Sequence, residues 1–207
     1  MKNMTVANKI LFSFSILLIA FIAFGVFAYH SVGELDDLNT GINQRTTLVA
    51  TSNRVAQAMQ KTRLYVFYQV VSVDPAKKHD FAQKVQDSRQ EVEDAFNALR
   101  EAKKNTDFGS PDITKQALSE LDAEQGLWEN YKRLSQAGDA MKDSNNREEA
   151  EAAILSPEIV EAFDTAVAGI NQDAQNCIRD AATQKELSQA KEARIAVITI
   201  VALLLVI

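Results

Sequence analysis

The fold is decided by residues 35–73, which read LDDLNTGINQRTTLVATSNRVAQAMQKTRLYVFYQVVSV. Most positions three or four apart are apolar or small, the spacing of an α-helix that packs in a bundle. The positions of this seam are Leu35, Leu38, Ile42, Arg45, Val49, Ser52, Ala56, Met59, Arg63, Val66, Val70 and Val73. Asp74 and Pro75 follow, and a proline cannot continue a helix. The pattern predicts one long helix from residue 30 to residue 73.

The rest of the middle of the chain is also helical in pattern. Ser110 and Ser156 each stand directly before a proline. In each pair the serine can cap the start of a helix, and the proline suits the first helical turn. Apolar periodicity and polar breaks predict helices at 76–105, 111–141 and 147–154, and a last one from 157 onward. We therefore expect an all-α fold, an antiparallel up-down-up-down four-helix bundle.

Residues 10–29 read ILFSFSILLIAFIAFGVFAY and carry no charge. Twenty helical residues extend about 30 Å, the thickness of the hydrocarbon core of a membrane. Lys2 and Lys9 precede the stretch and acidic residues follow it, so the positive-inside rule places 1–9 in the cytoplasm. A cleaved secretory signal peptide is the alternative, but its apolar core would be shorter. The sequence predicts a transmembrane helix at 10–29.

Residues 195–207 read IAVITIVALLLVI, an apolar run of thirteen residues after Arg194. This length is too short to cross a membrane. We expect 194–207 to be the truncated start of a second transmembrane helix, with the rest of a longer protein continuing in the cytoplasm. Residues 30–193 would then be a periplasmic four-helix-bundle ligand-binding domain. Its first and fourth helices would be continuous with the two spans.

Composition argues against several classes of function. All 28 acidic residues lie within 30–193, and no basic stripe offsets them, which argues against nucleic-acid binding. The chain lacks a glycine-rich phosphate loop, a G-x-S-x-G elbow and the E-x-x-H pattern of di-iron bundles, so we expect neither an enzyme nor a cofactor. His30 and His79 fall near opposite ends of the predicted bundle and cannot share a metal. Cys177, the single cysteine, lies on an apolar seam and is interpreted as a core residue.

The membrane-distal half of the predicted bundle collects arginines and aromatic residues. They are Arg54, Arg63, Tyr65, Tyr68, Trp128, Tyr131, Arg133 and Phe163. Arg63 occupies a seam position, where a guanidinium is costly to bury unless something pairs with it, and a ligand carboxylate would do so bidentately. Alternatively, Arg63 meets an acidic residue of a neighbouring helix or reaches solvent. Trp128 and Tyr131 could equally be core residues, since helical spacing alone predicts this.

Three stretches resemble bacterial methyl-accepting chemotaxis receptors with a four-helix-bundle sensor. Residues 4–18, MTVANKILFSFSILL, are similar to the usual start of these receptors. Residues 60–75, QKTRLYVFYQVVSVDP, resemble the end of the first bundle helix in aspartate- and serine-sensing members, and Arg63 matches their carboxylate-binding arginine. Tyr68 and Ser72 stand where those members have further arginines. Residues 155–163, LSPEIVEAF, match the start of the last helix, where polar residues around a proline contact ligand.

The resemblance implies a homodimer in the inner membrane, a piston-like shift of the last helix, and a cytoplasmic domain that meets a chemotaxis kinase and a coupling protein. It implies a small organic acid or amino acid as ligand and suggests, with the aromatic pattern, a site made of Arg63, Tyr68, Tyr65, Tyr131, Trp128, Arg133, Ser156 and Glu158. Two alternatives stay open. The sensor could belong to a histidine kinase or a cyclic-dinucleotide enzyme, or the bundle could be a non-sensory scaffold.

Overall fold

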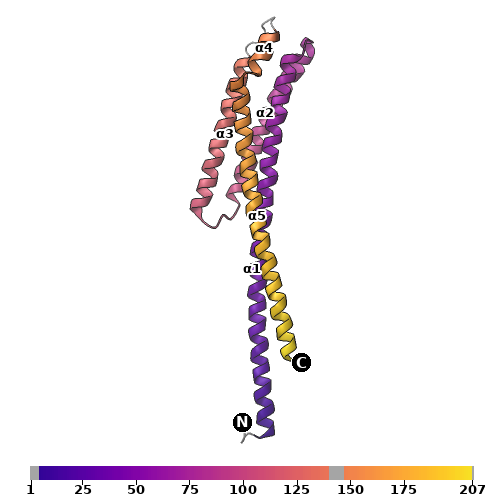
Figure 1. Cartoon of the computed structure of the whole chain (residues 1–207), viewed down its shortest axis with the longest axis vertical. Helices are drawn as coiled ribbons and strands as arrows, with labels where there is room; N and C mark the ends of the chain where they lie inside the picture. The colour runs from indigo at the N-terminus through magenta and orange to yellow at the C-terminus, as the bar shows by residue number, and fades with distance from the viewer. Residues whose placement is uncertain (1–4, 140–146, 207) are drawn as a thin grey trace. The chain divides into compact units, whose positions relative to one another are not determined.

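The computed structural model describes residues 5–139 and 147–206, and these residues form helices without a strand (Figure 1). The helices are α1 (Val6–Val71), α2 (Pro75–Lys104), α3 (Pro111–Asp139), α4 (Arg147–Ile154) and α5 (Pro157–Val206). The all-α prediction is confirmed. The helix ends that can be compared between residues 71 and 157 agree to within two residues, whereas α1 begins four residues before the predicted transmembrane helix at 10–29. The predicted break at 143–146 and the end of the third helix at 141 lie outside the described residues.

The chain divides into two compact units. We call Asn43–Asp180 the bundle unit, and Met1–Ile42 together with Ala181–Ile207 the terminal unit.

Side-chain caps set the helix starts of the bundle unit. The Ala76 N–H donates to Asp74 Oδ1 at 2.9 Å, directly before the first-turn proline of α2. Ser110 Oγ and Ser156 Oγ each accept a hydrogen bond from the N–H three residues on, at 3.3 and 3.4 Å. These bonds satisfy donors that a helix start otherwise leaves unpaired. Because the partners are two or three residues apart, the boundaries were readable from local sequence.

Gly109 makes the turn between α2 and α3 possible. Its φ of 84° lies in the left-handed region, which a side chain makes costly to adopt. The Gly109 N–H donates to Asp107 Oδ1 at 2.7 Å and holds the turn in this shape. The chain can therefore reverse between two long helices within six residues, 105–110.

Cross-helix contacts show that neighbouring helices of the bundle unit run in opposite directions. They join α1 to α2 through Gln44–Asn105 and Lys61–Glu91, α2 to α3 through Arg100–Asp122 and Glu93–Lys132, and α1 to α5 through Ser52–Asp173 and Arg63–Asp164. In each pair of helices, residue numbers rise along one partner as they fall along the other. This register is that of the predicted antiparallel four-helix bundle.

The core is wider than the predicted seam. Ser52, Ala56 and Met59 of the seam are buried as expected, but Leu48 and Val55 beside it are also fully buried. A helix that contacts two neighbours buries a broader face than the two positions per heptad of a simple coiled coil. Larger core side chains come from the other helices: Val92, Phe96, Leu99, Leu121, Trp128, Tyr131, Phe163 and Ile170.

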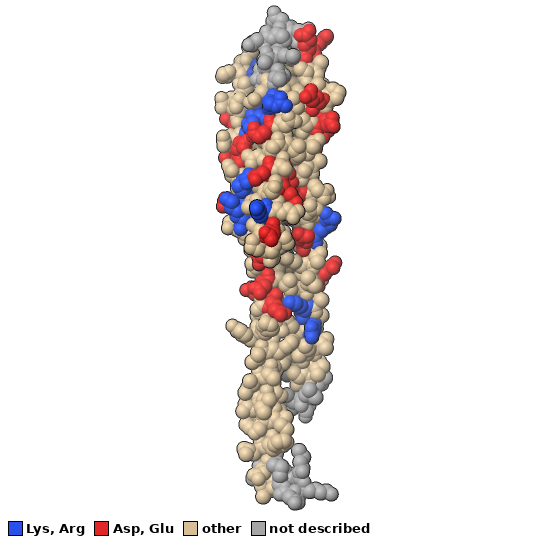
Figure 2. Space-filling view, turned by 90° about the vertical axis from the view of Figure 1, so that its left-hand side faces the viewer, with Lys and Arg blue, Asp and Glu red and all other residues tan. Residues whose placement is uncertain are grey.

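The surface differs between the two units. Acidic and basic side chains are interspersed over the face of the bundle unit seen in Figure 2. In the terminal unit, the N-terminal part of α1 exposes large apolar side chains, among them Leu11, Phe14, Ile19 and Val26. Among the described residues, α1 is the one helix that is long and apolar enough to cross a membrane. An exposed apolar surface of this extent indicates contact with lipid or protein. The apolar stretch after Arg194 is shorter, and its role as a second span stays a prediction.

Candidate functional site

Arg63 lies at a junction between α1 and α5. Its Nη1 donates to Asp164 Oδ1 at 3.0 Å, and its guanidinium carbon lies 4.4 Å from the centre of the Phe163 ring. The side chain of Arg63 is 35% exposed and that of Asp164 is 64% exposed. An ion pair this open to water adds little stability, whereas stacking on an aromatic face holds the guanidinium plane in place. Arg63 is therefore oriented by Phe163 and only weakly held by Asp164.

Aromatic rings continue from this junction into the core. Tyr131 meets Phe163 edge-on with ring centres 5.0 Å apart, and Trp128 lies 5.3 Å from Tyr131 on the same helix. Trp128 is fully buried and Tyr131 nearly so. The sequence left open whether these two residues pack in the core or face a ligand. In the structure both residues pack in the core, and Tyr131 contacts the Phe163 ring on which Arg63 is stacked.

Two shallow depressions flank the Arg63 side chain. One is lined by Arg63, Val66, Phe67, Tyr131, Ile154, Leu155 and Ile159, and the other by Gln60, Arg63, Leu64, Phe67 and Phe163. Both walls are mostly apolar, with the guanidinium as the charged group they share. Such a surface suits a small anion with an apolar body.

The other predicted residues lie apart from Arg63. Tyr65 and Tyr68 contact Phe81 of α2, with ring centres 6.4 and 5.3 Å apart, so they belong to the side of α1 that faces α2. Arg133 is exposed and bonds Asn130 within α3 at 2.9 Å.

Ser156 and Glu158 lie at the start of α5, where Ser156 caps the helix and Glu158 is an exposed first-turn acid. Their neighbours Leu155 and Ile159 line a depression beside Arg63. As ligand-binding residues, the eight positions stay predictions.

Several residues at this site were not predicted. Asp164 is the acidic partner that the sequence allowed for without identifying it. Phe67 lines both depressions and is 37% exposed, although it stands among apolar residues that read as a core segment. Its position four residues after Arg63, on the same face of the helix, is the signal that could have placed it at this site. The acidic partner carries no comparable signal, because α5 has many carboxylates at surface spacing.

A buried polar network lies elsewhere in the bundle unit. The Lys103 side chain is 2% exposed, and its Nζ donates to Asp173 Oδ1 at 2.7 Å and to the Ala117 carbonyl oxygen at 3.4 Å. Asp173 Oδ2 accepts a bond from Ser52 Oγ at 3.2 Å. The network thus joins α1, α2, α3 and α5 through one buried ion pair. Such a buried pair adds little net stability, because desolvation of both charges offsets their attraction, but removal of one partner leaves the other charge uncompensated.

Glu124 lies next to this network. Burial raises its pKa to about 7, assisted by the negative charge of Asp173, while Lys103 opposes the rise. Its Oε2 is buried without a hydrogen-bond partner among the described residues. Burial likewise raises the pKa of the Cys177 thiol to about 11, and Cys177 belongs to the apolar core as the sequence predicted. The thiol is therefore in its unreactive, protonated form at neutral pH.

The described residues contain no group of three His, Cys, Asp or Glu side chains that could hold a metal ion. A comparison with protein families gave one match. The model of the four helix bundle sensory module for signal transduction matches residues 3–192, nearly the whole chain. Comparisons with curated proteins and with solved structures gave no match. The match agrees with the antiparallel four-helix packing of the bundle unit, and the chain belongs to the family of four-helix-bundle sensory modules for signal transduction, that of the methyl-accepting chemotaxis proteins.

Proposed function

We propose that this sensory module binds a small organic anion, a carboxylate or an amino acid, at Arg63, and that binding displaces α5 relative to α1. The observation that carries the proposal is the Arg63 junction. One cation of α1 is stacked on Phe163 of α5 and paired with the exposed Asp164, next to two depressions with apolar walls.

A ligand carboxylate would act by competing with Asp164. It can bind the guanidinium bidentately, which the single Nη1–Oδ1 contact does not do. Loss of the Asp164 pair would leave α5 attached to α1 through the Phe163 stacking and the core. The ligand shifts the helices if it binds the two arrangements with different affinity. The Arg63 junction is therefore both the proposed binding group and the proposed coupling element.

The membrane arrangement is part of the proposal. Residues 1–9 would lie in the cytoplasm, 10–29 would cross the inner membrane, 30–193 would stand in the periplasm, and 194–207 would begin the return span. The exposed apolar residues of α1 between Leu11 and Val26 support the first span. A displacement of α5 would then reach a cytoplasmic signalling domain that meets a chemotaxis kinase and a coupling protein.

A homodimer is also proposed. Leu64 and Phe67 of α1 are 46% and 37% exposed and lie three residues apart, on one face of the helix. A second copy could cover this apolar face. A histidine kinase or a cyclic-dinucleotide enzyme would use the same sensor with another output, and a non-sensory bundle would bind no small molecule.

Trp128 makes a direct binding test possible. It is the single tryptophan, and its ring contacts Tyr131, which contacts Phe163 under the guanidinium. We expect its fluorescence in the full chain, held in neutral detergent micelles, to respond saturably to one or more of succinate, aspartate and benzoate. Arg63→Ala should abolish the response, because it removes the anion-binding group.

Arg54→Ala is the matched control, since Arg54 is an exposed arginine on the same helix. It should leave the response intact. An undiminished response in Arg63→Ala would show that the ligand binds elsewhere, and no response to any acid would count against an organic-anion sensor.

A further inference from the structure

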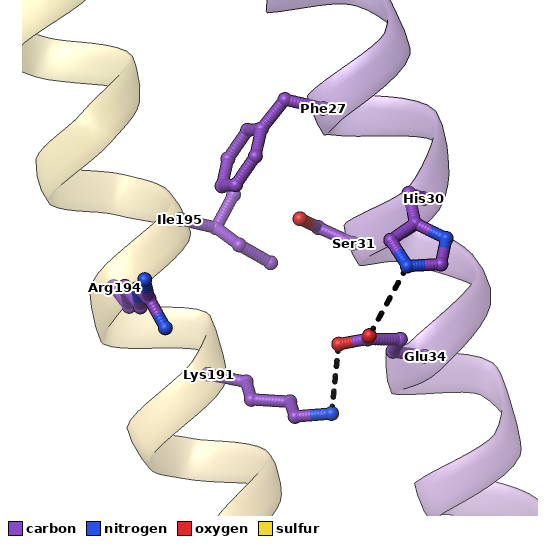
Figure 3. A pocket seen from close by; sticks show the side chains of 7 residues that line it. All are labelled: Phe27, His30, Ser31, Glu34, Lys191, Arg194 and Ile195. Carbon is purple, nitrogen blue, oxygen red and sulfur yellow. Dashed lines mark hydrogen bonds and ion pairs between the residues drawn. The ribbon is translucent and has the colours of Figure 1, made fainter.

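A second candidate site lies in the terminal unit, between α1 and α5. An open cleft there is lined by Phe27, His30, Ser31 and Glu34 of α1 and by Lys191, Arg194 and Ile195 of α5 (Figure 3). It holds about 520 Å³ of space, part of it open to solvent. The proposed organic-anion site uses none of these residues.

Basic groups outnumber acidic groups in this cleft. Glu34 Oε2 accepts a hydrogen bond from Lys191 Nζ at 2.8 Å, and Glu34 Oε1 lies 3.4 Å from His30 Nε2 (Figure 3). The hydrogen bond from Lys191 lowers the pKa of Glu34, with smaller contributions from His30 and Arg194. Among the described residues, Arg194 interacts with Glu34 through charge alone, without a direct bond. One carboxylate is thus surrounded by two permanent cations and an imidazole.

The cleft marks the place where both helices change from polar to apolar. His30 directly follows the uncharged residues 10–29, and Arg194 directly precedes the apolar residues 195–207. Phe27 and Ile195 form the wall on the apolar side, and Lys191 and Glu34 lie on the polar side (Figure 3). In the membrane arrangement proposed above, this level is that of the lipid headgroups.

We propose that this cleft binds a phosphate group, that of an anionic phospholipid headgroup, with Lys191 and Arg194 as its cationic partners. Both side chains can donate charge-assisted hydrogen bonds to phosphate oxygens. The His30 imidazole and the Ser31 hydroxyl line the same space and can add hydrogen-bond donors from α1. The acyl part of the lipid would lie along Phe27 and Ile195. The bound phosphate would therefore tie α1 to α5 at the membrane surface.

The negative charge of Glu34 repels a phosphate, so a variant without this charge should bind phosphate more strongly. Its carboxylate faces the same cleft and shares Lys191 with the incoming anion. Removal of that charge should strengthen phosphate binding, whereas removal of Lys191 and Arg194 should weaken it. A cleft with a purely structural role would not respond in opposite directions.

The two histidines allow the test in the full chain. We would label histidine with ¹³C and follow the two ring signals by NMR in neutral detergent micelles, assigning them with His30→Gln. His30 lines the cleft, and His79 is an exposed residue of α2 that serves as an internal control. Short-chain phosphatidylglycerol should shift the His30 signal saturably and leave His79 unchanged. Phosphatidylcholine, whose headgroup carries no net charge, should act much more weakly.

The variants separate the contributions. Lys191→Gln/Arg194→Gln should raise the midpoint of the phosphatidylglycerol titration about tenfold or more, because each basic group near anionic lipid contributes roughly a factor of five. Glu34→Gln should lower it. Arg54→Gln/Lys115→Gln changes the same charge at two exposed residues of the bundle unit and should have no effect.

Inorganic phosphate is the second arm. A saturable His30 shift at millimolar phosphate, lost in the double variant, would support the phosphate site with a soluble source in place of lipid. An unchanged His30 signal with both probes would overturn the proposal, as would an equal response to the two lipids or an unaffected double variant. The proposal rests on the membrane arrangement but not on the ligand at Arg63. A failed lipid titration beside an intact Trp128 response to acids would therefore refute this site alone.

Discussion

Removal of the Lys103 charge should destabilise the bundle unit strongly. Lys103→Met keeps most of the side-chain volume but leaves Asp173 without its cation, and the Asp173 side chain is only 11% exposed. The Ser52 hydroxyl would remain as its one hydrogen-bond donor among the described residues. A buried charge that loses its partner costs about 3–5 kcal/mol. A domain of ordinary stability has about 5–15 kcal/mol to lose, so the variant should fold with a much reduced margin.

Urea unfolding of the full chain in detergent micelles measures this loss. Trp128 is fully buried and is the single tryptophan, so its fluorescence reports the bundle unit. With a urea dependence of about 2 kcal/mol per molar, the midpoint should fall by about 1.5–2.5 M. Lys103→Met/Asp173→Asn removes both charges and should recover more than half of the loss, because no uncompensated charge remains.

Lys104→Met is the matched control for this prediction. Lys104 is the next residue, its side chain is 49% exposed, and it pairs with the exposed Glu101. The free energy of unfolding should change by less than about 1 kcal/mol. If Lys103→Met were as mild as Lys104→Met, or if the double variant were less stable than Lys103→Met, the reasoning about a buried ion pair would be wrong.

Three further predictions use the same fluorescence assay or a chemical probe. The pKa of Glu124 is about 7 in the folded chain, above its ordinary value of 4.5. The contribution of Glu124 to the free energy of unfolding is therefore fully present below pH 4.5 and is lost as pH rises through 7. After allowance for partial exposure of the side chain, the free energy of unfolding should fall by about 2 kcal/mol over that range. Urea titrations at pH 5 and pH 8 measure this fall, and Glu124→Gln should make the free energy of unfolding less dependent on pH. Gly109→Ala should cost about 1–2 kcal/mol because of the positive φ, whereas Gly126→Ala, inside α3 with open space around it, should stabilise by about 0.5–1 kcal/mol. Cys177 should resist iodoacetamide at pH 8 until urea unfolds the bundle, because its thiol is buried and its pKa is raised to about 11. Mass spectrometry measures the alkylation over time. Fast alkylation of the native chain would contradict this prediction.

At the candidate site, the sequence predicted that Arg63 needs a partner but not which side chains lie near it. Arg63 was singled out because a guanidinium on an apolar seam needs a partner, and it does have one in Asp164. Tyr65 and Tyr68 were grouped with it because they are close in sequence. On a helix, however, residues two and five positions away point in other directions. These two rings accordingly contact Phe81 of α2.

The cleft between α1 and α5 in the terminal unit was also beyond the reach of the sequence alone. In the sequence, Arg194 directly precedes the second apolar stretch and His30 falls near one end of the predicted bundle, whereas Lys191 and Glu34 were not singled out. Their arrangement around one space depends on the register between α1 and α5 in the terminal unit. At Gly41, the Gln184 side chain of α5 occupies the space that a Cβ on α1 would take. A close approach of this kind leaves no periodic signal in either helix.

The sequence by itself determined the all-α class and the helix boundaries that can be compared, because these depend on interactions between residues a few positions apart. Caps at Asp74, Ser110 and Ser156 are such interactions. Tertiary structure alone decided that Lys103 is buried against Asp173, 70 residues away, and that Glu124 lies beside them with a raised pKa. The physical reason is that helical spacing shows which residues share a face. Only the packing of the helices decides which helix faces contact each other. Burial then makes a few charged side chains affect stability far more than the exposed ones do.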